Sequence, residues 1–296
     1  MSRAVRIYEV GPRDGLQNEK AVIPTGKKIA LIDLLSDAGF AKIEATSFVS
    51  PKWVPQLADA EAVLAGIKRK PGVTYAALTP NLKGFERARA ARVDEVAIFA
   101  AASETFSRRN TNCSIAESFE RFAPIMDAAA AAGIPVRGYV SCVVACPYEG
   151  DIAPAAVCDV AARLMEMGCY EVSLGDTIGK GTPTTIAAML EVVLGSVPAE
   201  RLAGHYHDTD NRALDNVRAS LDLGLRTFDS AVGGLGGCPY APGAKGNVST
   251  TALARMLAME GWETGIDMDR LAAAEAYLAS EIATGAAPSG DQRDAI

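Results

Sequence analysis

Short apolar segments alternate along the chain with longer stretches in which apolar residues recur at helical spacing. The short segments are β-rich and number eight, centred on Ile7, Ile43, Tyr75, Ala97, Gly138, Val172, Gly204 and Phe228. The stretches between them predict helices, for example over 27–38, 55–68, 115–132, 154–167, 183–194 and 214–223. Strands that alternate with helices in this way are joined by right-handed crossovers and form a parallel sheet.

Glycines mark the ends of several predicted helices. Four of them follow a helical run where a left-handed residue would end a helix, and these are Gly39, Gly133, Gly168 and Gly224. Eight βα units in a row favour a closed TIM (β/α)8 barrel over an open doubly wound sheet. The first strand is followed by Gly11-Pro12-Arg13-Asp14-Gly15, which is not a dinucleotide-binding fingerprint. We therefore predict an α/β TIM barrel over about 5–260, with an extra C-terminal helix.

Composition agrees with a single domain over 1–296, in which a helical extension at about 265–285 follows the barrel. The chain has 296 residues, of which 49% are hydrophobic, and its net charge is −7. Both signs of charge are spread along it without a basic run, so we expect no nucleic-acid partner. No apolar run approaches the roughly 18 residues that span a membrane, and no leader precedes the first strand. We therefore expect a cytoplasmic protein with no membrane partner.

Polar side chains collect where the predicted strands end, which is where a TIM barrel carries its active site. The first predicted strand ends in Glu9, Arg13 and Asp14, and the second in Glu44, Thr46 and Ser47. The sixth ends in Ser173, Asp176 and Thr177, and the seventh in His205, His207 and Asp208. The eighth strand leads into a glycine-rich loop over 233–246, which holds Cys238 and closes on Asn247.

The chain has two histidines, His205 and His207, and both fall on one strand end. Residues two apart on a strand point to the same face, so both imidazoles can reach one ion, although a packed or surface pair is the alternative. Asp14 is the natural carboxylate partner and Asn247 a neutral oxygen donor, a set that suits Mg²⁺ or Mn²⁺. The alternatives are a turn residue for Asp14 and a helix N-cap for Asn247.

Two further side chains suit chemistry beside such an ion. The guanidinium of Arg13 can hold an enolate or thioester oxygen as negative charge develops, and a salt bridge to Glu9 or Glu44 is compatible with that role. Cys238 lies between glycines in a loop able to move over the barrel mouth. Nearby positive charge lowers the pKa of a free thiol, so this side chain can relay a proton, with an inert buried cysteine as the alternative.

Three blocks of the sequence resemble the 3-hydroxy-3-methylglutaryl-CoA lyase family over about residues 5–285. Glu9-Val10-Gly11-Pro12-Arg13-Asp14-Gly15-Leu16-Gln17-Asn18-Glu19 looks like the opening motif of that family. Gly233-Gly234-Leu235-Gly236-Gly237-Cys238-Pro239-Tyr240-Ala241 looks like its signature loop. Residues 137–142 with 146–150 resemble a third block.

The resemblance implies a divalent cation and a retro-Claisen cleavage of an acyl-CoA substrate to acetyl-CoA and acetoacetate. It puts the metal ligands on Asp14, His205, His207 and Asn247. It puts the catalytic groups on Arg13, Cys238, Asp176 and Glu44, and substrate contacts on Arg13, Gln17, Ser47 and Ser173. It also implies a homodimer. Two positions depart from the family: Thr251 replaces the usual Glu, and Asp210-Asn211 replaces Tyr-Gly.

Several alternatives stay open at this point. The base that removes the hydroxyl proton is His205, Asp176 or a water. A related lyase would act on another 3-hydroxyacyl-CoA, such as a methylmalyl or citramalyl thioester. A non-catalytic barrel would be expected to lack one of the four ligands, and all four are present. The pathway is leucine breakdown or another acid pathway.

Overall fold

A closed barrel of eight parallel strands forms the centre of the computed structural model, which describes residues 3–19, 21–237 and 246–282. In barrel order the strands are β1 (Arg6–Glu9), β10 (Thr227–Ser230), β9 (Leu202–Tyr206), β8 (Glu171–Asp176), β5 (Val136–Ser141), β4 (Glu95–Ala101), β3 (Thr74–Leu78) and β2 (Lys42–Ser47). Each predicted strand centre lies in one of these strands, so the TIM-barrel prediction is confirmed.

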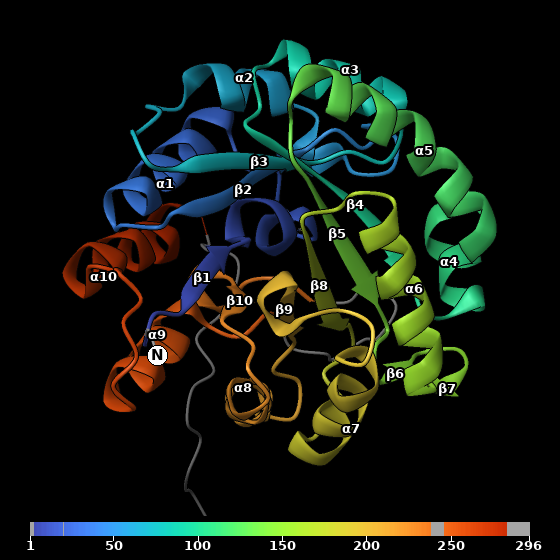
Figure 1. The fold of residues 1–296 in the computed structure, drawn as a ribbon. Helices are drawn as coiled ribbons and strands as arrows, with labels where there is room; N and C mark the ends of the chain where they lie inside the picture. Colours follow the sequence, from blue (N-terminus) through green and yellow to red (C-terminus); the bar gives the residue numbers. More distant parts are fainter. Residues whose placement is uncertain (1–2, 20, 238–245, 283–296) are drawn as a thin grey trace, which may run out of the picture.

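Helices surround the barrel in the order that the sequence predicts (Figure 1). They are α1 (Thr25–Asp37), α2 (Ala60–Gly66), α3 (Leu82–Ala90), α4 (Glu104–Thr111), α5 (Ile115–Ala132), α6 (Pro154–Glu166), α7 (Pro183–Val193), α8 (Ala213–Asp222), α9 (Thr250–Met259) and α10 (Met268–Tyr277). A two-stranded hairpin of β6 (Ala145–Cys146) and β7 (Gly150–Asp151) follows β5. Within the described residues, each helix is too short or too polar to cross a lipid bilayer.

Helix ends agree with the sequence signals in most places. Gly39, Gly133, Gly168 and Gly224 all have positive φ angles, between 66° and 104°, as the predicted helix ends require. The extra C-terminal helix is present as α10, which packs against α1 and continues into a π-helical turn over Leu278–Ile282. Asp267 caps its first turn by accepting hydrogen bonds from the backbone N–H groups of Asp269 and Arg270.

One predicted helix is wrong in its extent. The range 55–68 contains a 3₁₀ turn, Pro55–Leu57, and then α2, with a break at Asp59. Asp59 accepts hydrogen bonds from Thr25 Oγ1 at 2.7 Å and Lys28 Nζ at 2.8 Å, both on α1. These contacts with a neighbouring helix fix Asp59 outside the helical conformation, which the local pattern of apolar residues does not reveal.

The barrel interior is unusually polar, whereas TIM barrels are mostly filled by branched apolar side chains. Alternate residues of each strand point inward, and several of the buried charged side chains belong to this set: Glu44, Glu95, Arg137, Glu171 and Asp229. Buried charges are stable only when they are paired, and each of these has an ion-pair partner. The interior therefore holds a polar network that reaches up to the mouth of the barrel.

Candidate active site

A single π-helical turn, η1 (Gly11–Gly15), presents Arg13 and Asp14 at the end of β1. The carbonyl oxygen of Val10 accepts hydrogen bonds from the backbone N–H groups of Arg13 at 3.1 Å, Asp14 at 2.8 Å and Gly15 at 3.3 Å. Turns of this type are rare and are frequently found at functional sites. The turn needs glycine at Gly11, since a Cβ there would lie 2.5 Å from Glu9 Oε1.

Arg13 is held between two carboxylates. Its Nε and Nη2 both lie 2.7 Å from Glu44 Oε2, and its Nη1 donates to Asp14 Oδ1 at 2.6 Å. Of the two predicted partners, Glu44 is therefore right and Glu9 is wrong. Glu9 accepts instead from the backbone N–H groups of Gly11 and Val232 and from the Thr250 hydroxyl. Burial alone would lower the pKa of Arg13, but Glu44 and Asp14 raise it above its usual range.

Asp14, His205 and His207 converge at the mouth. Each offers one possible ligand atom, and these atoms lie within 4.8 Å of one another. Asn247 joins them: its Nδ2 donates to Asp14 Oδ2 at 2.8 Å, and it pairs with His207 through an isolated antiparallel bridge. The N-cap alternative for Asn247 is wrong, because Ser249 caps α9 by accepting from the backbone N–H of Ala252.

Unpartnered atoms support a cation between these side chains. His207 Nδ1 and Asn247 Oδ1 are buried, and neither has a hydrogen-bond partner among the described residues. Buried polar atoms without a partner are costly and call for an explanation. The donor set of carboxylate, amide oxygen and two imidazoles fits a divalent cation, so the residues present are compatible with the ion that the resemblance implies.

The charge states of these groups also suit ligation, which requires an ionised carboxylate and a neutral imidazole. Burial alone would raise the pKa of Asp14, but Arg13, His205 and His207 lower it to about 2. Burial and the neighbouring His205 lower the pKa of His207 to about 4. Near neutral pH, Asp14 is therefore ionised and His207 is neutral.

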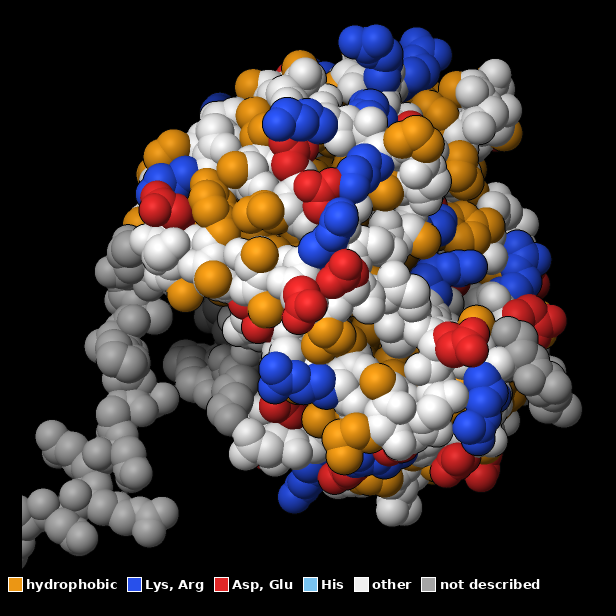
Figure 2. All heavy atoms as spheres, turned by 90° about the vertical axis from the view of Figure 1, so that its left-hand side faces the viewer, with side chains coloured by type: hydrophobic (Ala, Val, Ile, Leu, Met, Phe, Trp, Pro, Cys, Tyr) orange, Lys and Arg blue, Asp and Glu red, His pale blue; other side chains and the backbone are white. Residues whose placement is uncertain are grey.

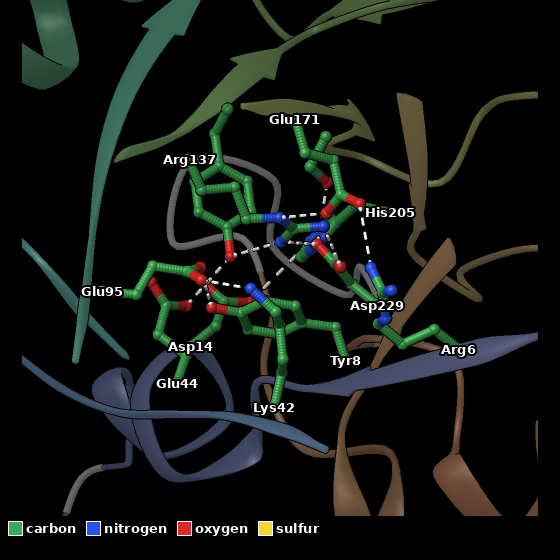
Figure 3. A network of polar contacts seen from close by, with 12 residues as sticks. Arg6, Tyr8, Asp14, Lys42, Glu44, Glu95, Arg137, Glu171, His205 and Asp229 are labelled. Carbon is green, nitrogen blue, oxygen red and sulfur yellow. Dashed lines mark hydrogen bonds and ion pairs between the residues drawn. The ribbon is translucent and has the colours of Figure 1, made fainter. Parts of the chain in front are cut away.

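Asp229, on β10, lies behind His205 and is not among the site residues that the sequence pattern predicts (Figure 3). In the register of β10 against β9, Asp229 pairs with His205, and its Oδ2 lies 3.1 Å from His205 Nδ1. It also receives hydrogen bonds from Arg137 and from Ser173. The signal that could have found it is a charged residue inside the eighth predicted strand, next to its centre at Phe228.

The other predicted site residues lie in different surroundings. Asp176 accepts hydrogen bonds from the backbone N–H groups of Lys180 and Gly181, and burial raises its pKa. Ser173 donates to Asp229 and Ser47 accepts from the backbone N–H of Val49. Gln17 is partly buried just after the η1 turn. Cys238 falls outside the described residues.

Thr251 and Asp210, which differ from the family pattern, lie in different surroundings. The hydroxyl of Thr251 is buried in the first turn of α9, without a hydrogen-bond partner among the described residues. Asp210, in the loop after β9, accepts from Lys180 Nζ at 3.1 Å on the exposed surface.

Fold and site together define a class: a parallel (β/α)8 barrel whose C-terminal mouth carries an acid, two imidazoles and an arginine in contact. Comparison then gives the family. The chain belongs to the HMGL-like family, whose model matches residues 4–278, and the family resemblance seen in the sequence is confirmed.

Two relatives and one crystal structure that are similar to this chain support the family assignment. A Rattus norvegicus protein named hydroxymethylglutaryl-CoA lyase, mitochondrial, is 57% identical over 94% of this chain and 86% of its own length. A Pseudomonas aeruginosa protein named 3-hydroxy-3-isohexenylglutaryl-CoA/hydroxy-methylglutaryl-CoA lyase is 58% identical over 92% and 90%. The crystal structure of the HMG-CoA lyase from Brucella melitensis has a TM-score of 0.92 and 61% identity, covering 93% of this chain and 98% of that one.

Proposed function

We propose that this protein is a carbon–carbon lyase that cleaves 3-hydroxy-3-methylglutaryl-CoA to acetyl-CoA and acetoacetate. The observation that carries the proposal is the convergence of Asp14, His205 and His207 beside Arg13 at the barrel mouth. Relatives more than half identical over nearly the whole chain carry this activity in their names. Those names favour the glutaryl thioester over the methylmalyl or citramalyl alternative.

Asp14, His205, His207 and Asn247 would hold the divalent cation, which we propose to be Mg²⁺ or Mn²⁺ because oxygen and imidazole donors with open positions suit these ions. When bound, such a cation makes a substrate hydroxyl more acidic and fixes its orientation. The buried, unpartnered Asn247 Oδ1 and His207 Nδ1 support this assignment.

Side chains of the protein would transfer the protons and stabilise the negative charge of the enolate. With His205 assigned to the cation, Asp176 and water are the candidates for the base that takes the hydroxyl proton as that oxygen becomes the ketone of acetoacetate. The electron pair of the C2–C3 bond passes to the acetyl-CoA enolate, whose oxygen Arg13 holds by charge and hydrogen bonds. We assign the return of a proton to the enolate carbon to Cys238 or water.

Supporting roles follow from the contacts of Arg13 and the mouth. Glu44 orients Arg13 through Oε2, and we propose substrate contacts for Gln17, Ser47 and Ser173. We also propose a single barrel domain with a helical extension and a cytoplasmic location, as the sequence pattern predicts. The resemblance supports a homodimer and a place in leucine breakdown.

The test is an assay of the purified protein with Mg²⁺ or Mn²⁺ against a panel of 3-hydroxyacyl-CoA thioesters. We expect acetyl-CoA and acetoacetate in equal amounts from the 3-hydroxy-3-methylglutaryl thioester. The panel includes the 3-isohexenyl analogue and the methylmalyl and citramalyl thioesters. Faster cleavage of one of these to an acyl-CoA and an oxo acid would reassign the substrate, and no product from any thioester would overturn the proposal.

A further inference from the structure

The polar network inside the barrel has a branch that leads through Asp229 to His205, one of the candidate ligands. Arg137, on β5, is fully buried and lies at the centre of this network (Figure 3). Its Nη2 donates to Asp229 Oδ1 at 2.8 Å and its Nη1 to Asp229 Oδ2 at 3.1 Å. The two bonds form a planar pair, which fixes the plane of the carboxylate as well as its position.

The remaining bonds of Asp229 show which partner must donate. Ser173 Oγ donates to Asp229 Oδ2 at 2.8 Å, and the same oxygen lies 3.1 Å from His205 Nδ1. An ionised carboxylate only accepts hydrogen bonds. In a neutral His205 ring, the proton therefore resides on Nδ1, and Nε2 is left with a free lone pair.

That free nitrogen faces the candidate cation site. His205 Nε2 lies 4.0 Å from Asp14 Oδ2, so two atoms with lone pairs face each other across a short gap. Such a pair suits a cation between them. In proteins, ligating imidazoles commonly donate their second N–H to a carboxylate, which fixes the tautomer and the ring orientation.

We infer that Asp229, locked by Arg137 and Ser173, is a positioning residue that holds His205 with Nε2 directed at the metal site. Among the predicted ligands, His205 is the one that the Asp229 carboxylate contacts by a hydrogen bond within the described residues. Its influence on the cation therefore passes through His205. The inference rests on the cation site of the proposed function, and not on which thioester is cleaved.

A second branch of the network shows why the barrel keeps a buried arginine here. Arg137 Nη1 also donates to Tyr139 OH at 2.9 Å, and Tyr139 OH donates to Glu44 Oε2 at 3.2 Å. Glu44 in turn holds Arg13. One guanidinium thus supports both the histidine side and the arginine side of the mouth.

The first experiment measures the affinity of the purified protein for Mn²⁺, by electron paramagnetic resonance of the free ion. For Asp229→Asn we expect an affinity 10- to 100-fold weaker than that of the wild type, which is the usual effect of losing such a partner. A folded Asp229→Asn variant with Mn²⁺ affinity within threefold of the wild type would overturn the inference.

Glu95→Gln is the matched control. Glu95 is also a fully buried barrel carboxylate paired with a cation, Lys42. Its hydrogen-bond partners among the described residues are Tyr8, Tyr170 and Lys42, and none of them is a predicted ligand. We expect this variant to lose stability and to keep its Mn²⁺ affinity. An equal loss of affinity in both variants would assign the effect to general weakening of the barrel and would count against Asp229.

A second measurement needs no variant. The chain has two histidines, His205 and His207. Labelling histidine with ¹⁵N therefore gives the signals of two imidazole rings in the NMR spectrum of the Mg²⁺-loaded protein. We expect the His205 proton on Nδ1, with Nε2 shifted when Mg²⁺ binds. A proton on Nε2, or no binding of Mg²⁺ or Mn²⁺, would overturn the inference, whereas the thioester assay tests the proposed function separately.

Discussion

At the scale of single residues, the contacts of Arg13 explain how its charged side chain is oriented at the mouth of the barrel. Glu44 and Asp14 hold its guanidinium from two sides, and the side chain is 8% exposed. Glu44 holds the guanidinium through Oε2, and its Oε1 has no hydrogen-bond partner among the described residues. Nη1 and Nη2 each carry a second N–H group, which can donate to another oxygen.

We predict that Arg13→Gln lowers turnover by about 100- to 1000-fold, the usual effect of removing a donor to a developing oxyanion. The amide can still hydrogen-bond Glu44, so the metal content should stay normal. Measuring kcat together with the bound metal separates the two effects. Arg218→Gln, which changes an arginine on the exposed face of α8, should match the wild type, and unchanged turnover in Arg13→Gln would remove it from the mechanism.

At the scale of elements, the mouth depends on the contact between the η1 turn and the start of the glycine-rich loop after β10. Glu9 joins them, since its Oε1 accepts from the backbone N–H groups of Gly11 at 2.8 Å and Val232 at 2.9 Å. Its Oε2 accepts from Thr250 in α9 at 2.7 Å. One buried carboxylate therefore sets the positions of three segments around the site.

We predict that Gly11→Ala lowers both activity and stability. A Cβ at Gly11 would lie 2.5 Å from Glu9 Oε1 and 3.2 Å from the Val232 nitrogen, so the turn must shift. Gly26→Ala, at the start of α1, is the matched control, because nothing lies within 4 Å of the added methyl group. It should be neutral or stabilise by up to about 1 kcal/mol. Urea unfolding and kcat/KM test both variants, and equal behaviour would contradict the role of the turn.

Glu9 should also make stability depend on pH. Burial raises its pKa from 4.5 to about 7, against the opposing effect of its bonds to Thr250, Val232 and Gly11. Between these two values the folded state binds more protons than the unfolded state, so the free energy of unfolding falls as pH rises through that window. The full effect is about 3 kcal/mol.

We predict that Glu9→Gln flattens this pH dependence. Urea unfolding at several pH values between about 4.5 and 8 measures it. The control is Glu120→Gln on the exposed face of α5, which should keep the slope of the wild type. A slope in Glu9→Gln as steep as that of the wild type would show that other groups cause the dependence.

At the scale of the whole molecule, charge is distributed without a dominant sign. On the face shown in Figure 2, basic and acidic side chains alternate among apolar atoms, with no broad basic surface on that face. This agrees with the mixed charges of the sequence. The groups that concentrate charge are instead inside the barrel, where they are paired.

Because the proposed ligands come from the η1 turn, from the end of β9 and from the segment after β10, binding of a cation should stabilise the entire barrel. We predict that Mg²⁺ or Mn²⁺ raises the melting temperature. At a concentration of 100 times Kd, the free energy of unfolding should increase by about 2.7 kcal/mol. A chelator should remove the gain and the activity together. Asp14→Asn should show no shift in thermal unfolding, and a shift as large as that of the wild type would contradict the assignment of Asp14.

The sequence by itself determined the barrel and most of its mouth. Alternation of strands and helices is local, and the C-terminal ends of parallel strands must meet, so Asp14, His205 and His207 could be expected together before any coordinates. The end of α5 at Gly133 is local too, since only the left-handed conformation is required there and nothing lies within 4 Å of an added Cβ.

Tertiary structure alone decided the rest, because it depends on strand register and on contacts between distant segments. The register of β10 against β9 puts Asp229 behind His205, and no spacing in the sequence specifies it. The turn around Gly11 turns Arg13 toward Glu44 and away from Glu9. Burial, which no local pattern measures, then forces these charges to pair, and so it fixes which side chains support the site.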